Sequence, residues 1–262
     1  MKTVSKIIAV HSYKGGTGKT LLSVNLAAVL AKNGKKVCVF DLDFRAPSLS
    51  AILKAENVEF WFNDYLNNTC DINKVLVDLS SRIPGNGKFF VSFANPATEA
   101  IRDMSSKDRK WEMRALGRLL ALRESLLRDQ KFDYLFFDTS PGIQYSSINA
   151  IVAADFVVVA TTADRSDVDG TKRMLQELYN LFEKKTGLVL NKVLDSSATA
   201  KKPEMSTKVK TVYQVPMLGI VPCFCEIMRA EGNLIFVQDK PDHPFTKILA
   251  EMARKIDNNK VN

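Results

Sequence analysis

The sequence predicts a single α/β domain built on a doubly wound, mostly parallel sheet with helices on both faces. Short apolar runs rich in valine, isoleucine and phenylalanine recur along the chain, and a helical pattern follows most of them. No linker interrupts the 262 residues. Glycine-rich or acidic motifs follow several of these runs, at the sheet edge where open α/β folds bind ligands.

Seven apolar runs have the length and composition of buried strands. β-Branched and aromatic residues are frequent in them, and helical or turn signals separate one run from the next. The expected strands cover residues 6–11, 36–41, 88–93, 133–138, 155–161, 186–191 and 217–221.

The helix after the first strand is expected from about Lys19 to Asn33. Its apolar residues recur at helical spacing, and Gly34 stands where a left-handed residue commonly ends a helix. The apolar positions are Leu22, Leu26, Val29 and Leu30.

A second long helix is expected from roughly Lys110 to Asp129, within a stretch, residues 102–131, that carries nine Lys or Arg against five Asp or Glu. Residues 195–203 are typical of a loop before a helix opened by Pro203, and a last helix is expected around 243–257. We therefore place one domain at 1–257 and a polar tail at 258–262. The apolar residues expected on one face of the second helix are Met113, Leu116, Leu119, Leu120 and Leu127.

The bulk properties favour an intracellular protein with anionic partners. A net charge of +8 suits nucleotide, nucleic acid or an acidic membrane, although a surface tuned for solubility has the same charge. The apolar run 7–10 is too short for a signal or a membrane span, and we expect a cytoplasmic location. The cysteines, whose irregular spacing indicates a reducing compartment, are Cys38, Cys70, Cys223 and Cys225.

Residues 11–20, HSYKGGTGKT, lie between the first strand and the first helix. Their glycines let the backbone approach a polyphosphate, and the helix N-terminus adds its positive dipole end. Lys19 is expected against the β- and γ-phosphates, with the Thr20 hydroxyl on Mg²⁺. The alternative, a glycine turn that is merely flexible, would require K-G-G-x-G-K-T to occur between a strand and a helix by chance. The residues expected to bind nucleotide here are Gly15, Gly16, Thr17, Gly18, Lys19, Thr20 and Leu21.

The loop departs from the usual G-x-x-x-x-G-K-[ST] pattern, because Tyr13 replaces the first glycine and Lys14 adds a second lysine. A second ammonium in the same concave space would be repelled by the first, so Lys14 is expected to point elsewhere. The motif K-G-G-T-G-K-T resembles the deviant Walker A motif of the ParA/MinD family of P-loop ATPases. The resemblance implies that Lys14 acts catalytically in trans, on the phosphates of ATP in a second subunit. A solvated loop lysine is the alternative.

Two acids, Asp41 and Asp43, end the second strand and share one face of it. Two carboxylates would repel a triphosphate unless a metal ion or a water molecule lay between them and the ligand. The resemblance implies that Asp43 positions or deprotonates the attacking water and that Asp41 lies in the outer shell of Mg²⁺. A capping or turn role is the alternative for Asp43.

Asp138 follows four apolar or aromatic residues at the end of the fourth expected strand, the usual form of a Walker B acid. A buried strand seldom ends in a carboxylate without a partner, and here the partner is expected to be hydrated Mg²⁺. Residues 139–142 then form a second switch segment, in which a backbone N–H near Gly142 could sense the γ-phosphate.

Base recognition is expected to favour adenine. Asn191 matches the family's adenine-contacting asparagine, and Leu194 stands where a GTPase would carry the aspartate of N-K-x-D. The turn holding Pro222 and Cys223 resembles the segment that closes over the adenine. Cys223 and Cys225 form C-x-C, whereas the related iron–sulfur carrier ATPases typically use C-x-x-C in a different frame.

The resemblance covers nearly the whole chain and implies an ATPase that pairs with a second copy of itself and meets an activating partner protein. Family members partition DNA, organise other cargo or regulate division sites at membranes. A membrane role is disfavoured here, because Ile248, Leu249, Met252 and Ile256 suit a helix docked on the sheet. Non-specific DNA binding is the other possibility, with a solvated face as its alternative. The basic candidates are Lys201, Lys202, Lys208, Lys210, Lys247, Arg254 and Lys255.

An unrelated activity, that of a bacterial-type tyrosine kinase, is suggested by DLDFRAPSLS at residues 41–50. Those kinases lack a counterpart of Lys14 and usually carry a tyrosine-rich tail, which this chain does not have. A scaffold that only binds ATP would be expected to lose Lys19, Asp43 or Asp138, and all three are present.

Overall fold

One sheet of eight strands organises the protein. The computed structural model describes residues 5–179, 182–194, 202–229 and 235–258. The strand order is β3-β4-β2-β5-β1-β6-β7-β8, and only β3 runs antiparallel to its neighbour. The strands are β1 (Lys6–His11), β2 (Lys36–Leu42), β3 (Val77–Asp78), β4 (Lys88–Ser92), β5 (Tyr134–Thr139), β6 (Phe156–Thr161), β7 (Lys185–Val193) and β8 (Met217–Pro222).

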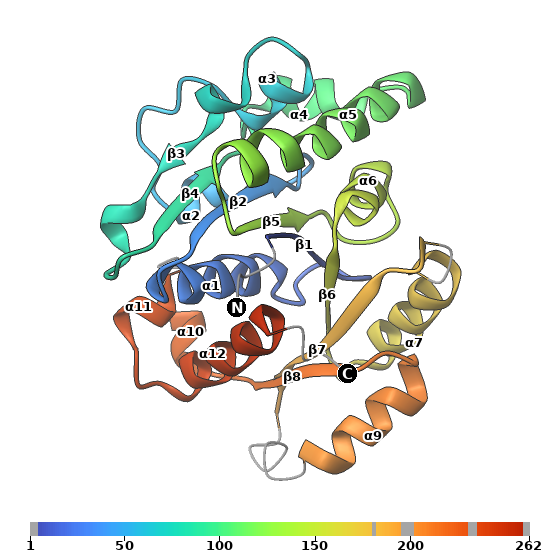
Figure 1. Ribbon diagram of the computed structural model, residues 1–262. Helices are drawn as coiled ribbons and strands as arrows, with labels where there is room; N and C mark the ends of the chain where they lie inside the picture. The colour runs from blue at the N-terminus through green and yellow to red at the C-terminus, as the bar shows by residue number, and fades with distance from the viewer. Residues whose placement is uncertain (1–4, 180–181, 195–201, 230–234, 259–262) are drawn as a thin grey trace.

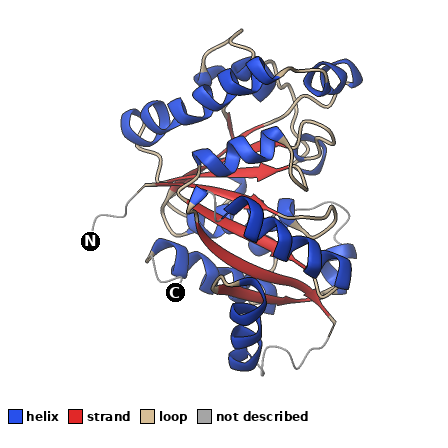
Figure 2. Ribbon diagram, turned by 90° about the vertical axis from the view of Figure 1, so that its right-hand side faces the viewer, coloured by secondary structure: helices blue, strands red, loops and turns tan. Residues whose placement is uncertain are grey.

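Helices cover both faces of this sheet, as Figures 1 and 2 show. Short 3₁₀ turns cover Ile72–Val75 and Ser80–Arg82, and π-helical turns extend two helices over Arg123–Asp129 and Leu175–Tyr179. None of the helices within the described ranges is long and apolar enough to cross a membrane. The helices are α1 (Lys19–Lys32), α2 (Leu49–Ile52), α3 (Phe62–Leu66), α4 (Thr98–Ser105), α5 (Arg109–Leu122), α6 (Tyr145–Ala153), α7 (Arg165–Met174), α9 (Lys202–Tyr213), α10 (Cys225–Arg229), α11 (Phe236–Asp239) and α12 (Pro244–Asp257).

The core forms two layers because side chains alternate along each strand. Along β1, Ile7 packs into a cluster with α5, α6, α7 and α9, whereas Ile8 packs into a cluster with α1, α11 and α12. Helix α1 is almost wholly buried between the sheet and α12. The doubly wound architecture predicted from the sequence is therefore confirmed.

Each of the seven expected strands is present, with ends within two residues of the predicted ones. The prediction missed β3, because two residues carry no alternating pattern. The first helix ends at Lys32, and Gly34 has a φ of 84°, as its terminator role requires. The loop expected at 195–203 lies mostly outside the described residues, and α9 begins at Lys202, one residue before Pro203.

The expected apolar face of the second helix is wrong in part. Leu119 is buried, but Met113 and Leu120 are 66% and 47% exposed. The residues that α5 buries include Trp111 and Ala115, which recur with Leu119 at four-residue spacing. The sequence prediction ranks residues by hydrophobicity alone, and therefore places the leucines and Met113 on the buried face in preference to Trp111 and Ala115.

Candidate active site

The glycine-rich loop connects β1 to α1 at the carboxyl edge of the sheet, beside β5 and β6. Gly16 and Gly18 have φ values of 75° and 94°, in the left-handed region that favours glycine. A Cβ at Gly18 would lie 2.4 Å from Nδ2 of Asn191, so only glycine fits there. The loop conformation is thus fixed both by backbone geometry and by contact with the end of β7.

Lys19 is buried at the start of α1, and its ammonium donates to Ser12 Oγ at 3.0 Å. Ser12 in turn donates to the carbonyl oxygen of Lys14 at 2.6 Å. Burial lowers the pKa of Lys19, and the charges of Asp138 and Asp43 oppose that shift. A cation held beneath its own loop in this way is suited to an anionic ligand.

Asp41 and Asp138 stand opposite each other in the register of β2 and β5, and both are buried. Asp138 accepts from Ser23 Oγ at 3.0 Å; burial raises its pKa to about 6, opposed by hydrogen bonds from Thr20 and Ser23. Burial first, and then the charge of Asp138, raise the pKa of Asp41 well above its usual range.

These two carboxyl groups fit a site for a hydrated divalent cation. Asp41 Oδ1 accepts from the backbone N–H of Asp43 at 3.0 Å, but its Oδ2 is buried without a hydrogen-bond partner among the described residues. A nearby cation would relieve the repulsion between the carboxylates, and its water ligands could donate to that oxygen.

Asp43 lies closer to the surface and connects the end of β2 to residues 139–142, the segment expected to act as a second switch. Its Oδ1 accepts from Ser140 Oγ at 3.0 Å and from the N–H of Ala46 at 3.3 Å. The Gly142 N–H donates to the carbonyl of Ser12 at 2.9 Å, so the second segment also contacts the phosphate loop. Hydrogen bonds thus connect the end of β2, residues 139–142 and the phosphate loop.

A cavity of about 480 Å³ opens above these groups. Gly15, Gly18, Lys19, Thr20 and Asp43 are among its lining residues. A hollow of about 620 Å³ adjoins it, and the two share Arg45, Ser140 and Gln144. The smaller cavity carries the phosphate-binding groups, so we regard it as the ligand site.

Lys14 is placed outside that cavity. Its ammonium lies 3.0 Å from Asp164 Oδ1 and donates to Ser166 Oγ at 2.5 Å, at the N-terminus of α7. The side chain is 48% exposed. Hydrogen bonds from Ser166 and then Lys14 lower the pKa of Asp164 to about 2. The expectation that the second lysine points away from its own loop agrees with this geometry.

Tyr13, which replaces the first glycine of the usual motif, packs against α7. A Cβ at Gly170 would lie 2.0 Å from Cε1 of the Tyr13 ring. The tyrosine and the Lys14–Asp164 pair therefore both connect the start of the loop to the same helix.

The residues expected around the adenine lie beside the loop rather than in the cavity lining. Asn191 is buried; its Nδ2 donates to the carbonyl of Thr17 at 2.7 Å and its Oδ1 accepts from the N–H of Lys192 at 2.9 Å. The Cys223 N–H donates to Val193 O at 2.9 Å, which places the turn after Pro222 against the end of β7. Cys223 and Cys225 are both free thiols.

Sequence reasoning gave no individual role to Ser12 or Ser140, which lie within predicted segments, and missed Ser23 and Asp164. Each of the four contacts a predicted residue. Asp164 follows the strand expected at 155–161, so the carboxyl-edge rule that singled out the other motifs could have found it. The three serines carry no comparable signal, because serine is common in every turn and helix start.

Comparison with known proteins identifies relatives over nearly the full length. A family model described as an AAA domain matches residues 5–196. The septum site-determining protein MinD of Synechocystis is 30% identical over 244 residues, 92% of this chain and 85% of that protein. The sporulation initiation inhibitor Soj of Bacillus subtilis is 29% identical over 177 residues, 66% of this chain and 64% of that protein.

Among solved structures, MinD of Pyrococcus horikoshii, complexed with Mg-ADP, superposes with a TM-score of 0.76 at 22% identity, covering 98% of both chains. Similarity at that identity concerns the fold. Because the family model spans most of the chain and the MinD relative aligns along nearly all of it, the protein belongs to the ParA/MinD family of P-loop ATPases.

Proposed function

We propose that the protein is an Mg²⁺-dependent ATPase switch: two copies meet face to face with ATP bound, separate after hydrolysis, and thereby position or partition DNA or another cargo. The observation that carries this proposal is the placement of Lys14. Its ammonium lies outside the cavity that Lys19 serves, held by an exposed ion pair with Asp164. Exposed pairs contribute little stability, so a second subunit's phosphates could displace Asp164.

Within one subunit, the backbone of Gly15 to Gly18 and the N-terminus of α1, up to Leu21, would hold the phosphates. Lys19 would neutralise their charge. Thr20, Asp41 and Asp138 would hold Mg²⁺, which supplies charge stabilisation for phosphoryl transfer when bound.

Asp43 would accept a hydrogen bond from the attacking water, since its carboxylate already reaches the cavity and is held by Ser140. Asn191, Pro222 and Cys223 would border the adenine. An activating partner protein would act by tightening this arrangement.

The trans role is tested with Lys14→Ala, compared with Lys88→Ala, which removes an exposed lysine from the opposite edge of the sheet. We expect Lys14→Ala to retain measurable ATP binding but to lose dimerisation with a non-hydrolysable analogue and to lose turnover. Lys88→Ala should behave as the wild type. Normal dimers of Lys14→Ala in sizing runs would refute the trans role.

The role of Asp43 is tested separately. We expect Asp43→Ala to accumulate an ATP-bound dimer, because the phosphates are still bound but the attacking water is no longer positioned. Single-turnover release of γ-phosphate measures this directly. Release as fast as in the wild type would remove Asp43 from the mechanism.

The surface on which the switch acts is proposed to be DNA, with a membrane as the second candidate because MinD relatives align along nearly the whole chain. Lys208 and Lys210 are exposed on α9, whereas Lys255 turns inward and donates to Leu218 O at 3.0 Å. Lys201 lies outside the described residues.

Co-sedimentation with duplex DNA and with anionic vesicles, in ATP and in ADP, distinguishes the two surfaces. DNA binding should fall steeply with added salt, because neutralised phosphates release counterions. ATP-dependent binding to vesicles alone would favour the membrane instead.

A further inference from the structure

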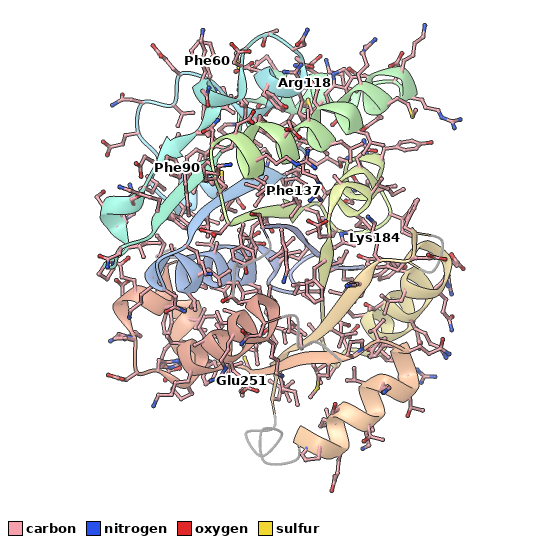
Figure 3. The ribbon with its side chains drawn as sticks, in the orientation of Figure 1. Phe60, Phe90, Arg118, Phe137, Lys184 and Glu251 are labelled. Carbon is pink, nitrogen blue, oxygen red and sulfur yellow. The ribbon has the colours of Figure 1, made fainter. Side chains whose placement is uncertain are left out.

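The outer face of α5 carries apolar side chains that nothing in the described ranges covers. Met113 and Leu120 are 66% and 47% exposed, and they stand seven residues apart on one side of the helix. The opposite side holds α5 in place: Arg118, labelled in Figure 3, stacks over the ring of Tyr65 at 4.1 Å. Figure 1 shows α5 in the outermost layer of the molecule.

Gly117 lies midway along this exposed face. It is in the interior of a regular helix, where glycine costs stability relative to alanine. A side chain there would meet no described atom within 4 Å of its Cβ. The fold of a single molecule therefore gives no reason for a glycine, whereas close approach of another backbone does.

The charges on this face are arranged symmetrically about Gly117. Lys110 precedes it by seven residues on α5, and Glu124 follows it by seven in the π-helical turn that continues the helix; both are exposed, and Glu124 also pairs with Arg128 at 2.7 Å. If a second copy of the helix lay antiparallel with its Gly117 opposite the first, Lys110 would face the partner's Glu124. Met113 would then lie opposite the partner's Ala121, one residue from the partner's Leu120, and Leu120 would lie opposite the partner's Arg114. Each of these contacts would occur twice, as a two-fold axis requires.

We propose that α5 of one molecule packs antiparallel against α5 of a second molecule, crossing at Gly117. This contact is separate from the surface that presents Lys14. A single pair of helices buries less than the ~1,200 Å² of a stable interface, so the contact is weak and concentration-dependent. In ATP, alternation of the two contacts would link dimers into longer assemblies.

A lipid surface fits this face less well. Membrane binding scales with the apolar area inserted, and Gly117 leaves a notch between the two large side chains rather than a continuous ridge. Such a notch suits the convex surface of another helix.

The proposal is tested by sedimentation equilibrium of the full chain without nucleotide. We expect reversible dimers whose dissociation constant rises at least about tenfold in Lys110→Glu and in Glu124→Lys, because each change places like charges opposite each other twice. The chain with both changes should regain most of the wild-type affinity. Lys88→Glu, on a distant edge, controls for net charge.

A second variant separates this contact from a loss of folding. Gly117→Leu should raise the melting temperature, since leucine favours a helix over glycine, yet it should abolish the nucleotide-free dimer by filling the notch. Wild-type protein that stays monomeric at its highest soluble concentration would overturn the proposal. So would a double charge swap that fails to restore association, or binding to anionic vesicles that Lys110→Glu removes while no self-association exists.

Discussion

His11 is a fully buried histidine directly before the phosphate loop. Its Nδ1 lies 2.7 Å from Thr139 Oγ1, which itself donates to Val10 O, so the ring nitrogen is the donor. The Nε2 atom has no partner among the described residues, and burial lowers the pKa of His11 to about 3. A second proton, on Nε2, would give the ring a positive charge that neither water nor a counterion among the described residues stabilises.

This burial predicts a pH dependence of stability. Below pH ~6.5 the unfolded chain takes up a proton at His11 that the folded chain refuses until its pKa near 3, so stability falls as the pH falls. Relative to His11→Asn, which keeps a donor towards Thr139, the wild type should lose up to about 1.4 kcal/mol per pH unit across that window. Urea unfolding of both proteins at several pH values measures it. A constant difference between them would contradict the prediction.

Asn191 binds the phosphate loop, a contact that its sequence motif does not predict. Because its amide donates to Thr17 O in the phosphate loop, Asn191→Ala should weaken binding of inorganic tripolyphosphate as well as ATP. Leu194→Ala, at an 89% exposed site nearby, should change neither affinity. Competition titrations compare the two ligands. Unchanged affinity for tripolyphosphate would restrict Asn191 to contacts with the base.

At the scale of single elements, α7 sets the position of the loop. Gly170→Ala improves helix propensity, but its Cβ would collide with the Tyr13 ring and displace the residue next to Lys14. We expect ATP binding through Lys19 to survive while ATP-dependent dimerisation weakens. Tyr13→Ala in the same chain should restore part of the loss by making room. Full dimerisation of Gly170→Ala would show that the loop adapts freely.

The elements that sequence predicts well are those with strong local signals. A strand buried on both faces is a continuous apolar run, and the loop glycines and strand-end acids are motifs within a few residues. The exposed side of α5 could not be predicted from the sequence, because Met113 and Leu120 are as apolar as the residues that are buried. Likewise Asp164 lies 150 positions from Lys14, and only the strand order brings the two together.

For the whole molecule, α12 closes the layer that covers α1. Leu249 and Met252 are buried against it, and Met252 fills the space left by Gly219 on β8. Leu249→Ala should cost about 2–5 kcal/mol through lost burial and a cavity. Lys247→Ala, on the exposed side, should cost almost nothing. Chemical unfolding compares them. Equal stabilities would mean that α12 contributes little to the fold.

Because strand β3 has only two residues, the edge strand at this margin of the sheet offers only a short stretch of backbone for a foreign strand to join. That brevity limits strand pairing between molecules at this margin, whereas β8, with six residues, forms the opposite edge of the sheet. Strand pairing between crowded molecules is therefore expected at the β8 edge rather than at the β3 edge.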